Sequence, residues 1–475
     1  MARPSSIIIA AAATQLRLML RDRRLAWAGA ILLLVAFASL AAGYARHQTL
    51  REERAAAAAQ DAEVWAAQGQ ANPHGAAHFG RNVYPDISPL AAFDPGLMDQ
   101  LGTSVRLESH AQNPSRDRPS EGGAALSRFA GFSPAWALQV VAPLLIILAG
   151  FTAFSGEAAR DRLRQEVASG ASTTRLVLGR ALGLCLAALS VVLLFGVAGS
   201  ATLLAAGEGG WSALAILASG YGLYLCAFAI LTVGVSARLA SARLCLTVML
   251  TVWALSTLLA PRVVPALAEQ LHPTPTAPAF EEAVSDEAKN GPNGHDPADA
   301  RLDALKAKTL QRYGVTDIED LPINWSGVAL EFGEENSTKA YRRHYERLRA
   351  LYAAQADVQR GFALLAPTLA ARPLSAAYAQ TDWAAHQRFL MAAEAYRYEL
   401  IQTLNRDIIK NRPPGDAPYM ADVDAITRHL RFKAPRPDLA ETWRAQRLNL
   451  LILALWVLAA TGLAMWSGRR LERSL

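Results

Sequence analysis

Long apolar runs dominate the pattern of hydrophobic and polar positions along this chain of 475 residues. A helix needs about 20 mainly apolar residues to cross the hydrocarbon layer of a membrane. Six runs come close to this length or exceed it, and they cover residues 25–44, 136–154, 181–206, 211–235, 244–260 and 448–466. The pattern therefore predicts an all-α integral membrane protein with about six transmembrane helices, of which the third to fifth lie within residues 181–260.

Two long polar segments, residues 45–135 and 261–447, interrupt these runs and make up more than half of the chain. Prolines, alanines and acidic residues at 261–297 predict a linker. After it, capping residues and helical spacing predict helices at 339–365 and 382–410. Strand signals are few, so we expect one large, mainly helical domain built from the two insertions.

Arginines gather at the ends of the apolar runs, and their distribution predicts the orientation of the chain. Arg and Lys close to a span are retained on the cytoplasmic side. Such clusters occupy segments 1–24, 155–180 and 467–475 and the turn between the fourth and fifth runs. We therefore expect cytoplasmic termini and extracytoplasmic insertions. About 24 residues precede the first run, which favours a retained anchor over a cleaved signal peptide.

Composition agrees with a membrane protein, because 52% of the residues are hydrophobic and only 19% are charged. The net charge of +6 lies largely beside the apolar runs, which favours lipid headgroups over nucleic acid as its partner. All three cysteines lie inside apolar runs, so neither a disulfide framework nor a cysteine metal site is expected.

Several motifs are absent from the sequence, and this narrows the function. There is no G-x-x-x-x-G-K-[ST] loop, no H-E-x-x-H and no G-x-S-x-G, so we expect no ATPase, metalloprotease or lipase activity in this chain and no bound cofactor. The interiors of the apolar runs carry no Asp, Glu, Lys, Arg or His, whereas ion-coupled carriers usually need one. An enzyme and a secondary transporter are both disfavoured.

Residues 156–179 form the most informative cytoplasmic segment. Leu163 and Val167 are one helical turn apart and charged residues surround them, which is typical of a short amphipathic helix at a membrane surface. A solvated basic loop that only sets the topology is the alternative. The residues on which the helical interpretation depends are Glu157, Arg160, Asp161, Leu163, Arg164 and Val167.

Three stretches in a fixed order carry a resemblance to a known family. The first holds His78, Phe79, Gly80, Tyr84, Ser88, Pro89, Leu90, Asp94, Pro95 and Gly96 and continues through 107–113. The second is 138–170. The third holds residues 373–375, Thr381, Asp382, His386, Phe389, Leu390, Glu394, Tyr396, Arg397 and residues 404–405. Together they resemble permease subunits of type 2 class ABC exporters, in the branch with a helical domain outside the membrane.

This resemblance implies a function and partners. A separate ABC ATPase dimer, working with ATP and Mg²⁺, would dock on 156–179 as a coupling helix, and a second copy or a similar permease chain would complete the pathway. Of the family's E-R-E-x-G-T-L pattern only Glu157 and Leu163 are present. The high Ala and Arg content and the topology favour a bacterial cytoplasmic membrane.

Two alternatives remain for the external residues and the function. The chain could be a mechanical transmitter that moves an extracytoplasmic partner without transport, and an anchored extracytoplasmic enzyme is the least favoured reading. His78, His110, His386 and Asp382 could bind a metal ion. Two ligands at helical spacing without a third are more often a hydrogen-bonded pair, so we expect no metal site and interpret 88–90 and 94–96 as turns.

Overall fold

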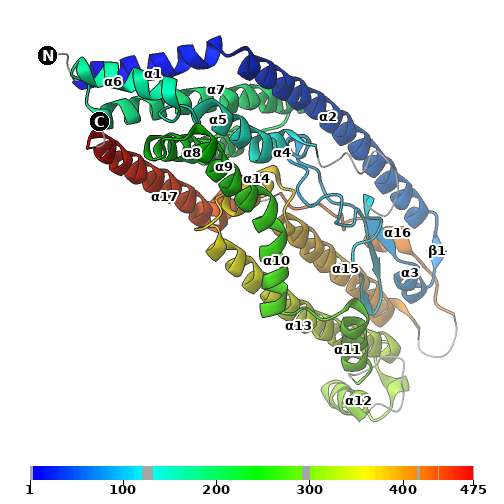
Figure 1. Cartoon of the computed structure of the whole chain (residues 1–475). Coiled ribbons are helices and arrows are strands. Elements are labelled where there is room, and N and C mark those ends of the chain that lie inside the picture. The colour runs from blue at the N-terminus through cyan, green and yellow to red at the C-terminus, as the bar shows by residue number, and fades with distance from the viewer. Residues whose placement is uncertain (1–3, 120–131, 291–299, 414–417, 437, 474–475) are drawn as a thin grey trace.

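The computed structural model describes residues 4–119, 132–290, 300–413, 418–436 and 438–473. These residues are mainly helical, as predicted, and they form a helical bundle that continues into an elongated second body (Figure 1). The bundle contains α1 (Pro4–Arg21), α2 (Arg23–Ala66), α4 (Pro134–Trp136), η4 (Ala137–Val141), α5 (Ala142–Gly150), α6 (Glu157–Ala168), α7 (Thr173–Ala206), α8 (Trp211–Arg238), α9 (Ala242–Trp253), η5 (Ala254–Leu259) and α17 (Leu439–Glu472).

Five helices among the described residues are long and apolar enough to cross a membrane. They are Leu25–Ala66, Thr173–Ala206, Trp211–Arg238, Ala242–Leu271 and Leu439–Glu472, and each contains one of the predicted runs. The remaining run, 136–154, forms the shorter apolar helix Pro134–Gly150. At 1.5 Å per residue its 17 residues reach about 25 Å, less than the roughly 30 Å of a hydrocarbon layer.

Ser236 of α8 explains why this shorter helix ends where it does. Its hydroxyl accepts hydrogen bonds from the backbone N–H groups of Phe154 (2.9 Å) and Ser155 (3.2 Å). These amides then need no partner inside a helix, so the chain can turn before α6. Periodicity alone could not reveal this tertiary contact.

The N-terminal helix α1 crosses α7 at two small residues. A Cβ atom on Gly179 would lie 2.6 Å from the carbonyl oxygen of Ile8, and one on Gly183 would lie 2.6 Å from that of Ala12. Glycines four residues apart let two helix backbones touch in this way. The sequence analysis treated 1–24 only as a segment that sets orientation, and it missed this helix.

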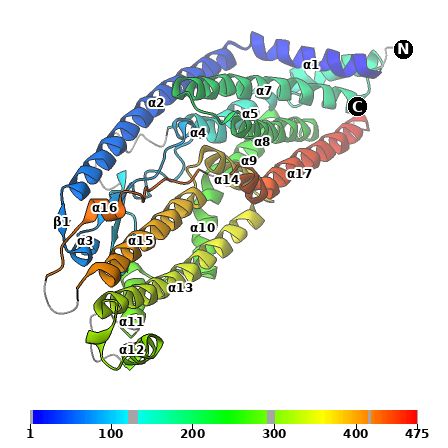
Figure 2. The same ribbon diagram turned by 180° about the vertical axis from the view of Figure 1, so that it is seen from behind.

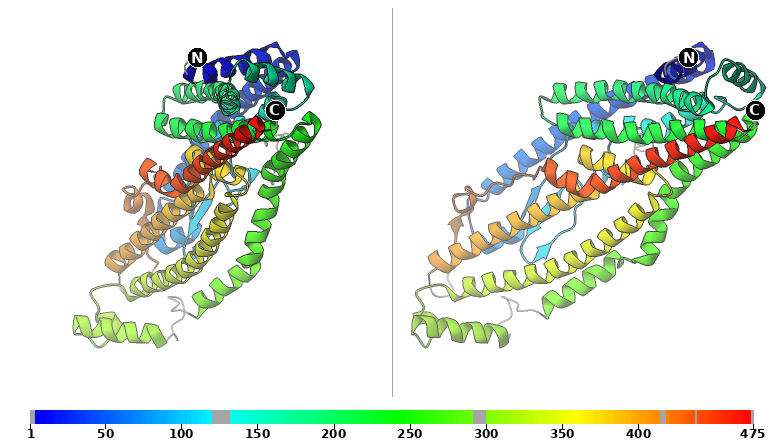
Figure 3. Two further views of the ribbon diagram at one scale, coloured as in Figure 1. Left: turned by 60° about the vertical axis from the view of Figure 1, so that its left-hand side comes forward. Right: turned by 90° about the vertical axis from the view of Figure 1, so that its left-hand side faces the viewer.

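The two insertions together form the second body. It contains α3 (Pro73–Phe79), η1 (Pro89–Ala92), α10 (Ala260–Leu271), α11 (Ala277–Lys289), α12 (Ala300–Tyr313), η6 (Ile318–Asp320), α13 (Trp325–Phe362), α14 (Thr368–Ala379), α15 (Trp383–Asn411) and α16 (Val423–Thr427). Of these elements, η1 and α14 pack into the bundle, because buried Leu90 and Leu374 belong to the same apolar cluster as Tyr221 of α8. The strands of the second body are β1 (Gln70–Ala71), β2 (Arg81–Val83), β3 (Val105–Glu108), β4 (Ala111–Gln112) and β5 (Ala421–Asp422). The long helices α13 and α15 run side by side, while α2 extends past its apolar run to reach the same body (Figures 2 and 3).

Short antiparallel pairings connect segments that are far apart in sequence. Strand β1 of the first insertion pairs with β5 of the second in the register Gln70↔Asp422, and β2, β3 and β4 form a separate small sheet. Buried Trp65, Leu400 and Leu404 share one apolar cluster beside the β1–β5 pair. The two insertions therefore fold as one unit.

Two predicted boundaries in this body were wrong. The linker expected at 261–297 is helical over α10 and α11, and its residues 291–297 lie outside the described part of the chain. Pro261 lies inside the continuous helix Ala242–Leu271, directly after the π-helical turn η5, where the regular hydrogen-bond ladder of the helix is already interrupted. Helix α13 begins at Trp325 rather than near 339, because Asn324 caps it by accepting from the Ser326 and Gly327 amides.

Candidate functional site

The first and third motif stretches, which are almost 300 residues apart, meet in the structure. The amide of Leu97, directly after the Asp94-Pro95-Gly96 turn, donates to the carbonyl oxygen of Thr381 (2.9 Å). Gly96 has a φ of +47°, and a Cβ there would lie 2.7 Å from the same oxygen. Only glycine meets both demands, which explains the residue type at this position.

Asp94 begins a chain of buried hydrogen bonds that runs from the second body into the bundle. The Ser375 hydroxyl of α14 donates to the Asp94 carboxylate, and it accepts from the Tyr221 hydroxyl of α8 (2.8 Å). Gln139 of η4 donates to the Tyr221 oxygen (2.9 Å). Burial raises the pKa of Asp94, and the hydrogen bonds from Ser375 and the Gly96 amide offset this only in part.

A second chain of hydrogen bonds lies beside the first. The Tyr224 hydroxyl donates to the carbonyl oxygen of Gln139 (2.7 Å) and lies 3.0 Å from the Thr368 hydroxyl of α14, which in turn lies 3.2 Å from that of Ser256 in η5. We call the set Asp94, Gln139, Tyr221, Tyr224, Thr368 and Ser375 the junction. Each bond contributes about 1 kcal/mol net, so the junction resists separation of the bundle from the second body.

The motif stretches contain only half of the junction. Asp94, Gln139 and Ser375 belong to them, whereas the two tyrosines lie in a run that the sequence predicts simply as a span. The available signal was a pair of tyrosines three residues apart, 221 and 224, near the middle of an otherwise apolar segment. A buried tyrosine hydroxyl needs a hydrogen-bond partner.

Arg397 and Glu394 of the third stretch belong to a buried ion cluster on α15. Arg397 is 1% exposed and donates two hydrogen bonds to Glu394, at 2.7 and 2.8 Å. It also pairs with Glu334 of α13, which is fully buried. Burial alone would raise the pKa of Glu334, but the Arg397 guanidinium and His110 outweigh it and lower that pKa to about 2. These residues hold helices together, and Glu334 was not singled out from the sequence.

Other members of the motif stretches shape the backbone or the core. The Ser88 hydroxyl caps η1, where Pro89 and Leu90 are buried, and Asp382 caps α15 by accepting from the Ala385 amide (3.0 Å). Tyr396 packs against Phe432, with ring centroids 5.7 Å apart. Phe79 is half exposed beside Gly80, whose φ is +67° at a close approach to Leu107.

His386 is separate from the other histidines that were considered for a metal site. Its Nε2 lies 3.1 Å from the Ser115 hydroxyl, and burial followed by the charge of Arg118 lowers its pKa to about 4. It lines a cavity of about 910 Å³ between α11, α13 and α15, together with Phe280, Tyr341, Tyr345, Tyr352 and Trp383. His78 and His110 lie together elsewhere, with His74 as a third member.

The predicted amphipathic segment forms α6, at the end of the bundle where both chain ends lie (Figure 1). Leu163 is fully buried in the main core and Val167 packs against that core. Glu157, Asp161 and Arg164 are exposed on the other side, and the last two form an ion pair of 2.7 Å. Arg160 is half-buried. The apolar face of α6 is thus covered by its own chain, and the charged face is open to solvent.

Arg180 fastens α6 to the bundle. Its side chain is 1% exposed, pairs with Glu166 at the end of α6 (2.6 Å), donates to the carbonyl oxygen of Ala153 and lies 4.2 Å from the centre of the Phe154 ring. In the sequence it was counted only among the arginines that set orientation. Its place before an apolar run gives no hint of burial.

Comparison with known proteins gives one match. Residues 279–421 match a family model described as a domain of unknown function (DUF3526), which covers less than a third of the chain. The matched part runs from α11 to β5 and includes Glu334, Ser375 and Arg397. No curated protein and no solved structure matches the chain.

Proposed function

We propose that this chain is the membrane-spanning permease subunit of an ABC transporter, an exporter by the resemblance of its motif stretches, and that a separate ATPase dimer drives it by docking on α6. The observation that carries this proposal is the two-sided character of α6. Its buried face and Arg180 connect it to the spans, while its charged face is available to a partner. A force that a docked partner applies to α6 would then reach the bundle.

The proposed orientation places α6 and both chain ends in the cytoplasm of a bacterial cell, with the second body outside its inner membrane. The Arg-rich flanks support this because positive charge beside a span is retained inside. Arg469 and Arg470 lie at the α6 end, because they follow Gly468, whose carbonyl oxygen accepts from the Thr173 hydroxyl at the start of α7 (2.8 Å). A second permease copy is part of the proposal through the family resemblance.

Co-purification with an ATPase tests the proposal. The tagged chain, solubilised in detergent, is mixed with the ATPase subunit encoded beside it, and we expect the two to elute together. Glu157→Arg with Asp161→Arg reverses two exposed charges and should abolish the complex. The matched control, Glu319→Arg with Asp320→Arg, reverses two exposed charges far along the second body and should retain it.

The choice of positions matters in this experiment. Leu163→Asp would place a carboxylate in the core, so loss of binding could reflect unfolding alone. If the ATPase binds neither the native chain nor the control, the permease proposal fails. Binding that survives the reversal at 157 and 161 would place the docking surface elsewhere.

The junction favours a second candidate function, in which the chain works an external partner mechanically. The bundle and the second body share buried hydrogen bonds through Tyr221, Ser375 and Asp94, so movement of the spans would carry the second body with it. Reconstituted vesicles distinguish the two candidates. Nucleotide-dependent movement of the second body without transport of any solute supports the mechanical role, and transport contradicts it.

A further inference from the structure

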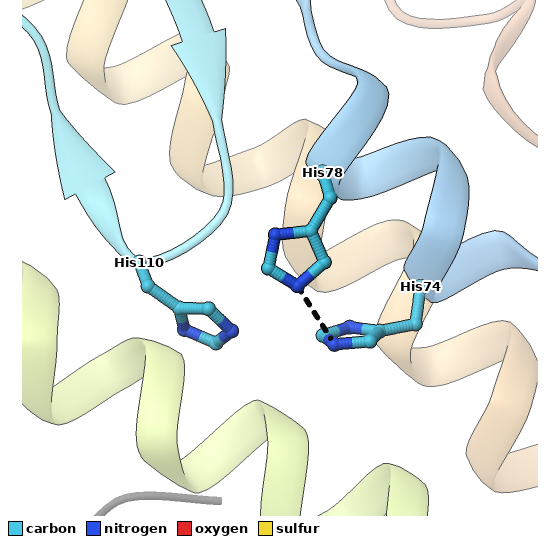
Figure 4. Close-up of side chains that lie close together, drawn as sticks. All are labelled: His74, His78 and His110. Atoms are coloured by element: carbon cyan, nitrogen blue, oxygen red, sulfur yellow. Dashed lines mark hydrogen bonds between the residues drawn. The ribbon is translucent and has the colours of Figure 1, made fainter. Parts of the chain in front are cut away.

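Three histidines from two segments of the first insertion come together on the second body. His74 and His78 lie one turn apart on α3, and His110 lies in the tight turn between β3 and β4 (Figure 4). The ring centroids of His74 and His78 are 4.6 Å apart, and the His110 centroid lies 5.7 Å from that of His74 and 5.3 Å from that of His78. One ligand nitrogen from each ring lies within 4.8 Å of those of the other two.

This spacing suits a shared metal ion. Two imidazole nitrogens bound to a tetrahedral ion at 2.0–2.1 Å lie about 3.3–3.4 Å from each other. The Nε2 atoms of His74 and His78 are 3.1 Å apart, so this pair already has the required separation (Figure 4). The His110 nitrogen lies within 4.8 Å of both, so it would have to approach by at most about 1.4 Å to complete the same spacing.

Glu334 provides the support that a metal-binding histidine usually has. One of its carboxylate oxygens lies 3.2 Å from Nδ1 of His110 and also accepts from the His110 backbone amide (2.8 Å). A carboxylate that accepts the Nδ1 proton fixes the tautomer in which Nε2 is the ligand. Glu334 is fully buried and paired with Arg397, so its own position is fixed.

The backbone of His110 is also unusual. Its φ is +63°, a conformation that is uncommon for a residue with a Cβ. Its amide and ring both bind Glu334 in this conformation. The surrounding structure therefore holds His110 in a strained turn that points its ring toward His78, as Figure 4 shows.

We propose that His74, His78 and His110 bind one divalent transition-metal ion of the zinc class, with Glu334 as the residue that positions His110. Neutral imidazoles suit this class of ion, whereas Mg²⁺ and Ca²⁺ prefer oxygen ligands. His78 is exposed, so the fourth coordination position faces solvent. The ion joins α3 to the β3–β4 turn, which also contacts α13 through the hydrogen bond from the His110 amide to Glu334. The site is independent of the transport proposal.

Zinc binding to the full-length chain tests this proposal. The protein carries an affinity tag without histidine, is stripped with a chelator in detergent, and is titrated with Zn²⁺ or, for comparison, Mg²⁺. We expect one tightly bound Zn²⁺ per chain and no competition by Mg²⁺. Co²⁺ in place of Zn²⁺ should give the visible absorption of a tetrahedral nitrogen site.

Matched variants identify the ligands. His78→Ala and His110→Ala should each remove the tight site, while His429→Ala, which changes an exposed histidine on another segment, should retain it. Glu334→Gln should weaken affinity about 10- to 100-fold, whereas Glu335→Gln next to it should not. Circular dichroism confirms that each variant is folded. Equal zinc binding by the native chain and by the triple variant of His74, His78 and His110, or no tight binding by the native chain, overturns the proposal.

Discussion

Two buried arginines fasten the two ends of this molecule in different ways. Arg180 at the α6 end pairs with Glu166, whose side chain is 22% exposed. Arg397 in the second body lies between Glu394 and the fully buried Glu334, and it also donates to Thr338 and to the backbone of Glu108. One arginine thus has a single carboxylate partner that reaches water, and the other is the centre of a buried network.

This difference predicts that the ion pair at α6 opens more easily than the buried network in the second body. A pair whose carboxylate reaches water can open at modest cost, because solvent replaces the lost partner. A network in which a buried carboxylate depends on one arginine cannot open without leaving that charge unpaired. We therefore expect the ion pair at the α6 end to contribute less stability than the buried network, while the second body moves as one piece.

The largest effect is expected for Arg397→Met. The substitution leaves Glu334 as a buried charge without its main partner, which should destabilise the second body by about 3–5 kcal/mol. Thermal unfolding in detergent and the protease resistance of α13 and α15 measure this. Arg406→Met is the control, because Arg406 is exposed in its pairs with Glu331 and Glu399 and should cost at most about 1 kcal/mol. Similar losses of stability in both variants would show that the buried network around Arg397 does not stabilise the second body more than an exposed ion pair does.

Acid should destabilise the second body before it affects the α6 end. The pKa of His386 is lowered to about 4 in the folded chain, against 6.5 for an ordinary histidine. The unfolded state therefore binds a proton first, and stability present above pH 6.5 is lost as the pH falls toward 4, by up to about 3 kcal/mol. Unfolding midpoints between pH 7.5 and 4 measure this. His386→Gln should flatten the dependence, and an unchanged slope would contradict the assignment.

A smaller and local effect is expected for Arg180→Met. Glu166 can turn toward solvent when its partner is lost, so the cost should be about 1–2 kcal/mol and confined to α6. Hydrogen exchange should become faster across Glu157–Ala168 and stay unchanged in α13 and α15. Arg164→Met, which removes the exposed partner of Asp161, is the control with no expected change. Faster hydrogen exchange throughout the chain would show that Arg180 stabilises more of the molecule than α6.

The smallest effect is expected for Asp94→Asn at the junction. Burial raises the pKa of Asp94, so the charged form is less favourable in the folded state than in water, and asparagine keeps the shape and one oxygen acceptor without that charge. We expect a change below about 1 kcal/mol, whereas Asp94→Ala leaves the Ser375 hydroxyl and the Gly96 amide without an acceptor and should cost about 1–3 kcal/mol. Thermal unfolding compares the two. An asparagine variant that is as unstable as the alanine variant would show that the charge is required.

The sequence predicted the features that depend on local pattern. Hydrophobic runs predicted the five helices that are long and apolar enough to cross a membrane, because the required length is set by the bilayer. Cap residues located the start of α15 at Asp382, and Leu163 and Val167 one helical turn apart among charged residues indicated α6. The motif stretches drew attention to Asp94, Ser375 and Arg397, although not to what they contact.

Features that depend on contacts between distant segments could not be predicted. Glu334 is a buried ion-pair partner only because α13 faces α15, and His74 joins His78 and His110 only because the β3–β4 turn approaches α3. The hydroxyl of Ser236 ends an apolar helix about 80 residues away in sequence. Such roles arise from tertiary packing, which periodicity does not contain.

The central claim is that a force applied at α6 reaches the second body, and one distance measurement tests it most directly. Arg164 on α6 and Glu319 in η6 are both exposed, so each position can carry a spin label. The three cysteines of the chain are first replaced by alanine, so that only these two positions are labelled. With the ATPase and a nonhydrolysable ATP analogue bound, the account predicts a changed distance between the labels, and it predicts that Arg180→Met reduces this change without preventing ATPase binding. An ATPase that binds and hydrolyses ATP while the distance stays constant would contradict the account.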